Sequence, residues 1–414
     1  MLKNFVKKIK EIRDLLRHNP NLILYGPPGT GKTYTAKAVA YYMITGKEPD
    51  LHNDEWEQKL NDYQFNPEQK DNQDNSKTKN DKPGKWAIVQ FHPAYNYDDF
   101  VRGITVETDK EGQVKYSTLW KVLGEMSRRA LISMFSLDEL KTDNEESKGE
   151  VYDKALEKWQ SMSRAKRMEK VEKAPPFILI IDEINRANLP AVLGELIYAL
   201  EYRGEPVKTL YGDELIIPPN LYIIGTMNTA DRSAGRIDYA IRRRFTFYPM
   251  HAEPDYDVVS DYGQKLMNAV NGFIEKNVSP DYDPEDIKIG YTYFISKRKD
   301  DKDKKKDIAY KFIYQVIPLL YEYIRDGLVN TEIVKSMQDN KERREGYKLS
   351  LSIDLETGQE VSGNEEKVYY LRGGRLYKDD KLIEMGDLWF MKTQQENQTQ
   401  SQNGNENDGT GEQD

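Results

Sequence analysis

A glycine-rich stretch early in the chain has the spacing of a phosphate-binding loop. Gly26 is followed after four residues by Gly31, Lys32 and Thr33. Glycines let backbone amides turn inward and cradle phosphates at the start of a helix. Lys32 is expected to reach the β- and γ-phosphates, and the Thr33 hydroxyl is expected to ligate Mg²⁺. The predicted nucleotide-binding residues of this stretch are Gly26, Pro27, Pro28, Gly29, Thr30, Gly31, Lys32, Thr33 and Tyr34.

An acidic pair ends the most apolar segment of the chain. Residues 177–181 read Phe-Ile-Leu-Ile-Ile, which suits a parallel strand buried on both faces, and Asp182 and Glu183 follow. Asp182 is expected to hold Mg²⁺ through water, and Glu183 to polarise the attacking water. Such a pair alone could cap a helix. Together with the glycine-rich loop it predicts hydrolysis of a nucleoside triphosphate.

Polar residues also follow the apolar run at 221–225. If these two apolar runs form adjacent strands, Asn228 lies beside the γ-phosphate and can orient water without adding charge. Asp231 and Arg232 follow closely, and their alternative interpretation is a turn with a surface ion pair.

Three consecutive arginines, 242–244, end a predicted helix. Arg243 or Arg244 is predicted to reach the γ-phosphate of a neighbouring subunit and to stabilise the charge that develops in the transition state. A favourable position at a helix C-terminus explains only one of the three. Turnover would then depend on oligomerisation.

Short apolar runs alternate with helical patterns over the first 253 residues, which predicts an α/β fold with a parallel sheet flanked by helices. A lysine- and aspartate-rich run at 298–307 is expected to be a solvated loop. The predicted organisation is a nucleotide-binding domain over 1–253 with a polar insertion at 46–85 and a charged helical insertion at 137–172, a helical lid over 254–330, a small β-hairpin-rich appendix over 331–392, and a disordered tail over 393–414.

The composition excludes several classes of protein. A net charge of -9 disfavours a globally basic nucleic-acid binder. Cysteine is absent, which excludes a disulfide framework and a thiolate nucleophile, and the four histidines lack a metal-ligand spacing. No apolar run approaches the roughly 20 residues of a membrane span, and the N-terminus lacks a secretory apolar region. We therefore expect a cytoplasmic protein without membrane association.

Together, these motifs resemble those of the AAA+ superfamily and, more narrowly, of its McrB branch, the GTP-driven motors of modification-dependent restriction systems. The resemblance covers residues 5–330, roughly. It rests on the glycine-rich loop, on Gln-Phe-His-Pro-Ala-Tyr-Asn-Tyr-Asp-Asp-Phe at 90–100, on Asp-Glu-Ile-Asn-Arg-Ala-Asn at 182–188 and on Met-Asn-Thr-Ala-Asp-Arg-Ser at 227–233. We call residues 227–233 the signature loop, because it is the most specific of the four. Residues 289–294 are similar to a segment of the family's helical lid.

The resemblance implies roles for individual residues. It implies that Asn228 is the sensor that positions water, and that Asp231 and Arg232 communicate with an activating nuclease partner. It also implies that three arginines contact a neighbouring nucleotide, namely Arg186, Arg243 and Arg244.

The resemblance also implies an assembly. The expected assembly is a hexameric ring with an McrC-like endonuclease subunit that carries the nuclease site, and DNA is reached through the complex. The family's best-known members begin with a DNA-reading domain, whereas this chain begins at the motor. DNA recognition is therefore expected in another subunit or in the appendix.

Three functions remain open on the sequence. The first is an NTP-hydrolysing motor of a McrBC-like restriction and defence complex. The second is an ATP-dependent remodelling protein of the MoxR or dynein-related type that acts on proteins, and the third is a slowly hydrolysing scaffold whose output is ring assembly. GTP is implied by the resemblance alone, and ATP remains open.

Overall fold

The computed structural model describes residues 2–50, 55–66, 84–108, 114–140, 148–231, 237–252, 259–335, 345–361 and 365–392. The chain folds into two compact units. Unit 1 comprises Met1–Tyr25 and Lys32–Met250, and unit 2 comprises Gly26–Gly31 and His251–Asp414. The six residues Gly26–Gly31 therefore belong with the second half of the chain, which the predicted division at residue 253 did not foresee.

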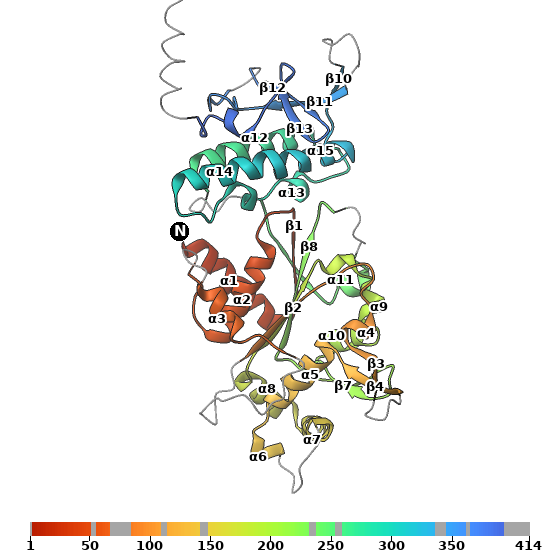
Figure 1. The fold of residues 1–414 in the computed structure, drawn as a ribbon. Helices are drawn as coiled ribbons and strands as arrows, with labels where there is room; N and C mark the ends of the chain where they lie inside the picture. The colour runs from red at the N-terminus through yellow and green to blue at the C-terminus, as the bar shows by residue number, and fades with distance from the viewer. Residues whose placement is uncertain are drawn as a thin grey trace, which may run out of the picture. The chain divides into compact units, whose positions relative to one another are not determined.

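A five-stranded sheet forms the centre of unit 1 (Figure 1). Its strand order is β2-β5-β8-β1-β9. The pairs β2–β5, β5–β8 and β1–β9 are parallel. The predicted α/β fold class is confirmed. The strands are β1 (Asn21–Gly26), β2 (Lys85–Gln90), β5 (Phe177–Asp182), β8 (Leu221–Asn228) and β9 (Thr246–Pro249).

Both faces of this sheet are covered by helices, because its central strands are apolar on both sides. In β5, Ile178 and Ile180 pack into one hydrophobic cluster while Leu179 and Ile181 pack into another, as the alternation of side chains along a strand requires. The first cluster includes α1 (Leu2–His18), α2 (Lys32–Thr45) and α3 (Glu55–Asn61). The second includes α5 (Val122–Ser133), α7 (Lys148–Ser161), α9 (Leu189–Leu193), α10 (Leu196–Glu201) and α11 (Tyr239–Arg242).

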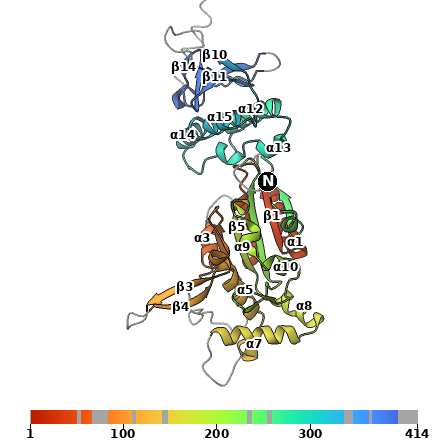
Figure 2. The same ribbon diagram turned by 90° about the vertical axis from the view of Figure 1, so that its right-hand side faces the viewer.

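Unit 1 also contains several shorter helices and strands. The hairpin of β3 and β4 is separate from the central sheet (Figure 2). Residues 51–54 and 67–83 of the predicted polar insertion lie outside the described residues. The smaller elements are α4 (Tyr97–Phe100), β3 (Arg102–Thr108), β4 (Val114–Trp120), α6 (Leu137–Leu140), α8 (Arg164–Lys173), η2 (Ile184–Arg186), β6 (Val207–Lys208) and β7 (Glu214–Leu215).

Helices make up the first part of unit 2. They are α12 (Asp261–Asn277), α13 (Pro284–Ile287), η3 (Tyr291–Phe294), α14 (Asp301–Lys311), the π-helical η4 (Phe312–Val316) and α15 (Ile317–Arg325). The prediction of a solvated loop at 298–307 is wrong, because α14 begins at Asp301. The Asp300 side chain accepts from the backbone amide of Lys302 at 2.9 Å, which caps the helix, and Ile308 and Ala309 anchor it in the core.

An antiparallel sheet follows in unit 2, with its strands in chain order β10-β11-β12-β13-β14. A tight turn at Gly373 and Gly374, whose φ angles are 54° and 73°, joins β12 to β13. The predicted disordered tail at 393–414 lies outside the described residues. The elements are β10 (Ile333–Lys335), β11 (Glu345–Leu351), β12 (Lys367–Arg372), β13 (Arg375–Lys378), β14 (Lys381–Leu382) and η5 (Met385–Asp387).

In the part of the chain that the structure describes, no helix combines the length and the apolar character needed to cross a bilayer.

Candidate active site

The glycine-rich loop joins β1 to α2 through a tight turn. Gly29 and Gly31 have φ angles of 78° and 76°, a backbone conformation that side chains disfavour. The Thr30 hydroxyl is buried and donates to the Pro27 carbonyl at 3.1 Å, which closes the turn. The helix α2 begins directly afterwards at Lys32, so the loop ends at a helix N-terminus, where backbone amides favour anions.

Residues 290–292 bind this loop through hydrogen bonds between the two backbones. The amide of Gly290 donates to the Pro28 carbonyl at 2.9 Å, and the amide of Thr292 donates to the Gly29 carbonyl at 3.0 Å. A Cβ on residue 290 would collide with the backbone of Gly29 and Thr30. Position 290 therefore requires glycine because two backbone segments touch there. The sequence pointed to residues 289–294 only through family likeness, without a role.

The close approach at Gly290 leads to a first prediction. Gly290→Ala should displace the glycine-rich loop at a cost of about 1–3 kcal/mol, as overpacking does. We expect weaker nucleotide binding, measured by isothermal titration calorimetry, and slower turnover. Gly272→Ala is the matched control, since a Cβ there meets open space in α12, and the helix should gain roughly 0.5–1 kcal/mol. Equal nucleotide affinity in the two variants would contradict the assignment.

One oxygen of Asp182 joins three elements of unit 1. Its Oδ1 accepts from the Thr33 hydroxyl at 2.7 Å and from the Thr226 hydroxyl at 2.6 Å. Asp182 ends β5, Thr226 lies in β8 and Thr33 lies in the first turn of α2. The Thr226 hydroxyl also accepts from the amide of Glu183 at 3.1 Å. Thr226 was not predicted as a site residue. The only sign of its role in the sequence is a hydroxyl near the end of an apolar strand.

The oxygens of Thr33 and Asp182 fit a magnesium ion. Mg²⁺ prefers hard oxygen ligands, and in nucleotide sites it takes one or two from the protein and others from phosphates and water. The hydroxyl and carboxylate meet at 2.7 Å. Within the described ranges, no group of three or more His, Cys, Asp or Glu side chains could hold a metal. The oxygens of Thr33 and Asp182 suit an ion that takes its other ligands from phosphates and water.

Glu183 is held in an uncommon backbone conformation. Its φ and ψ of 54° and 47° are left-handed, and such strain concentrates at functional positions. The Asn228 side-chain amide donates to its Oε1, and the Arg186 guanidinium lies 3.4 Å from its Oε2. Burial raises the pKa of the Glu183 carboxyl, and Arg186 opposes this by lowering it. The carboxylate is thus fixed between an amide and a cation.

Arg186 lies against carboxylates of its own subunit. Besides Glu183, its guanidinium contacts Asp231 at 2.8 Å. The guanidinium thus lies between two acidic side chains of unit 1, and the contact with a neighbouring nucleotide that the resemblance implied stays a prediction. Arg232, the other predicted residue of the signature loop, lies outside the described residues.

Lys32 and Tyr34 both lie in the first turns of α2, in different environments. Burial lowers the pKa of Lys32 to about 8, although Glu183 and Asp182 raise it. The Tyr34 ring packs beside Trp56 at 5.2 Å between ring centres. The ring of Tyr34 thus packs among the helices of unit 1, and its contact with the nucleotide stays a prediction.

The lowered pKa of Lys32 leads to a second prediction. Phosphates should raise this pKa, so binding takes up a proton above pH 8 and is weakened as pH rises through 8. Between pH 7 and pH 9 nucleotide affinity should fall about tenfold, since each pH unit above the pKa costs that factor. Calorimetry in buffers of different ionisation enthalpy would detect the proton. Lys32→Arg, which stays charged, should show neither effect, and a proton uptake in that variant would contradict the assignment.

The three consecutive arginines differ in their surroundings. Only 8% of the Arg244 side chain is exposed, and its guanidinium contacts Glu201 at 2.8 Å. For Arg243, 66% is exposed. The Arg242 guanidinium lies 4.6 Å from the ring centre of Phe247. The prediction that Arg244 could reach a neighbouring subunit is therefore corrected, because this side chain is buried in an ion pair of its own unit. The role of Arg243 toward a neighbouring subunit stays a prediction.

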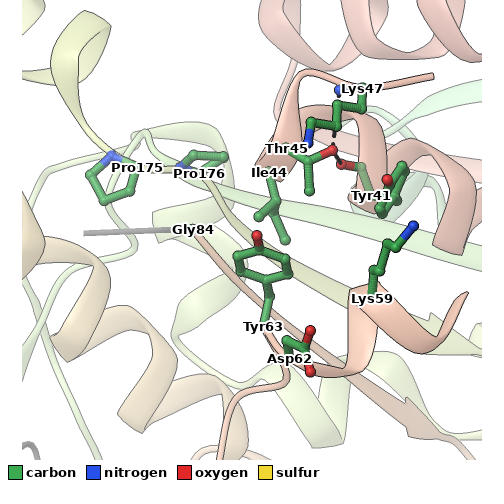
Figure 3. Close-up of a pocket in the computed structure, with 10 residues that line it drawn as sticks. All are labelled: Tyr41, Ile44, Thr45, Lys47, Lys59, Asp62, Tyr63, Gly84, Pro175 and Pro176. Atoms are coloured by element: carbon green, nitrogen blue, oxygen red, sulfur yellow. Dashed lines mark hydrogen bonds between the residues drawn. The ribbon is translucent and has the colours of Figure 1, made fainter. Parts of the chain in front are cut away.

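A hollow of about 430 Å³ lies elsewhere on unit 1 (Figure 3). Its lining includes Gly84 and Pro176, which precede β2 and β5, so it lies at the amino-terminal ends of these strands. Asp182 lies at the opposite, carboxyl-terminal end of β5. The hollow is not part of the candidate site.

Comparison with known proteins assigns the chain to a family. The model "AAA domain (dynein-related subfamily)" matches residues 77–245, and "ATPase family associated with various cellular activities (AAA)" matches residues 22–60. The chain is 29% identical over 343 residues to the "Type IV methyl-directed restriction enzyme EcoKMcrB subunit" of Escherichia coli (strain K12), which is 77% of this chain and 57% of that one. The chain is an AAA+ protein that is similar to McrB over most of its length.

Two further relatives match shorter parts of the chain. The "Type II restriction enzyme BsuMI component YdiS" of Bacillus subtilis (strain 168) is 37% identical over 94 residues, or 19% of this chain and 27% of that one. A "Proteasome-activating nucleotidase" of Methanococcus maripaludis is 48% identical over 52 residues, or 10% and 13%. The chain thus spans 57% of the length of its Escherichia coli relative and less of the others. The resemblance stated from the motifs is confirmed.

Proposed function

We propose that the chain hydrolyses a nucleoside triphosphate, with GTP preferred, as the motor subunit of a McrBC-like restriction complex that powers a partner endonuclease. The observation that carries hydrolysis is the meeting of Thr33 and Thr226 on Asp182, with Glu183 fixed beside it by Asn228. The similarity to two restriction-enzyme components supports the biological setting. The preference for GTP rests on the family resemblance.

The mechanism assigns one task to each side chain. Lys32 and the amides of the glycine-rich loop bind the phosphates. Thr33 and Asp182 would hold Mg²⁺, which when bound neutralises charge on phosphate oxygens. Glu183 accepts a proton from the attacking water, and Asn228 keeps that carboxylate in place.

Changing the proposed base gives a third prediction. Glu183→Gln keeps the size of the side chain but removes its proton-accepting charge, so turnover should fall by roughly 100-fold or more while nucleotide binding persists. Phosphate release and equilibrium binding measure the two quantities. Glu205→Gln, an exposed carboxylate of the same unit, is the control and should leave both unchanged. Normal turnover by Glu183→Gln would sink the assignment.

The proposed site is completed by a neighbouring subunit in a homo-oligomeric ring, which the resemblance implies to be hexameric. The exposed Arg243 is the residue offered to the neighbour's γ-phosphate. It lies one helical turn after Tyr239, which is 88% exposed, and its amide donates to the Tyr239 carbonyl at 3.1 Å. An aromatic residue and an arginine that are exposed side by side are typical of an interface centre.

A shared site gives a fourth prediction. Lys32→Ala and Arg243→Ala proteins should each be inactive, and an equal mixture should recover activity because one contributes the lysine and the other the arginine. With random assembly about a quarter of the head-to-tail interfaces are intact, so recovery should approach that fraction of wild-type turnover. Arg244→Ala should instead lower the unfolding temperature, since it breaks the buried pair with Glu201. No recovery at any mixing ratio would refute the shared site.

The signature loop is proposed as the contact for an McrC-like endonuclease subunit. Asp231 holds Arg186, and Arg186 lies against Glu183, so a partner that moves Asp231 can alter the environment of the base. DNA is reached through the complex.

An alternative is an ATP-dependent remodelling protein acting on protein partners, which the description of the matched dynein-related subfamily supports. Hydrolysis of GTP and ATP compared side by side separates the two. A strong preference for ATP would favour remodelling, whereas a preference for GTP would favour the restriction motor.

A further inference from the structure

The antiparallel sheet of unit 2 has two faces of different chemistry. The helices α12 and α15 pack on one of them (Figure 1). Successive side chains along a strand point to opposite faces. Four residues of the packed face are at most 1% exposed: Leu349, Tyr369, Leu371 and Leu376. The residues at the intervening positions therefore form the other face.

That other face gathers aromatic and basic side chains. Tyr370 of β12 lies directly opposite Tyr377 of β13, and Lys348 of β11 lies opposite Tyr370 on its other side. In the next row Arg372 lies opposite Arg375. The Arg372 guanidinium is 5.5 Å from the ring centre of Tyr377. We call these five residues the Tyr–Arg face.

The stability of the sheet does not account for the two arginines. Like charges directly opposite each other on neighbouring strands are destabilising. Arg372 is offset by Asp380 at 2.8 Å, and Lys348 by Glu332 at 3.1 Å. Arg375 is exposed beside the turn at Gly373 and Gly374. An anion that bridged the two guanidinium groups would remove the repulsion.

We propose that the Tyr–Arg face binds single-stranded nucleic acid, with phosphates on its basic side chains and bases stacked on its tyrosines. Sheets that carry aromatic and basic residues bind single strands in this way, because every base offers a ring face and every nucleotide a charge. The whole chain carries a net charge of -9, so attraction must come from a local surface such as this one. The site lies outside the proposed hydrolytic residues and does not depend on their function.

Binding of a fluorescent oligothymidylate of 15 nucleotides to the full chain, followed by anisotropy without nucleotide or Mg²⁺, tests the proposal. Arg372→Gln with Arg375→Gln should weaken binding about tenfold or more at low salt. It should also reduce the dependence of log K on log salt by about 1.4, because each phosphate that no longer meets an arginine accounts for about 0.7. Tyr377→Leu keeps an apolar strand residue but removes the ring, and it should weaken binding roughly fivefold to a hundredfold.

Matched controls separate this site from a general effect of charge. Arg325→Gln removes an exposed arginine at the end of α15, and Tyr314→Leu removes an exposed tyrosine of η4. Both should bind like wild type and keep the wild-type unfolding temperature. Arg375→Lys should retain most of the affinity even if the double variant is less stable.

Several outcomes would overturn the proposal. They are no binding by the wild-type chain at 50 mM salt, equal losses in the control variants, and tighter binding of a duplex that Tyr377→Leu leaves unchanged. If an acidic peptide displaced the labelled oligonucleotide and the unlabelled oligonucleotide did not, the face would be a site for a protein instead. Nucleotide turnover of the same preparations tests the proposed hydrolysis separately.

Discussion

The candidate site depends on a single shared acceptor, the Oδ1 atom of Asp182. Two hydroxyls donate to it, Thr33 at 2.7 Å and Thr226 at 2.6 Å, and they come from a helix and a strand that are far apart in the sequence. Because one of these hydroxyls also accepts from the amide of Glu183, the same oxygen fixes the backbone of the proposed base. The parallel sheet makes this possible, since β5 and β8 are adjacent and end at the same edge.

From this point a continuous set of polar contacts runs outward to the signature loop. Asn228 holds one oxygen of Glu183, Arg186 lies beside the other, and Asp231 holds Arg186. The left-handed backbone of Glu183 shows that these contacts outweigh a local conformational cost. A partner bound at the signature loop would therefore act on hydrolysis through side chains already in contact with the base.

The sequence predicted the parts of the site that follow from local pattern. Residues after apolar runs are brought together at one edge of a parallel sheet, which is why Asp182, Glu183 and Asn228 could be named in advance. The role of Gly290 could not, because it arises from contact between segments that are about 260 residues apart. Arg243 and Arg244 are indistinguishable in sequence and both lie near Glu201, so only the burial of the Arg244 side chain separates them. The run at 298–307 was misread because its charges hid the capping Asp300 and the buried Ile308.

We propose that the hydrolytic site is incomplete in a single chain. Turnover per chain, measured across a wide range of protein concentration beside size-exclusion chromatography with nucleotide present, tests it most directly. We expect turnover per chain to rise with concentration and to level off once the chain elutes as an assembly. Constant turnover per chain over concentrations at which the protein elutes as a monomer would contradict it.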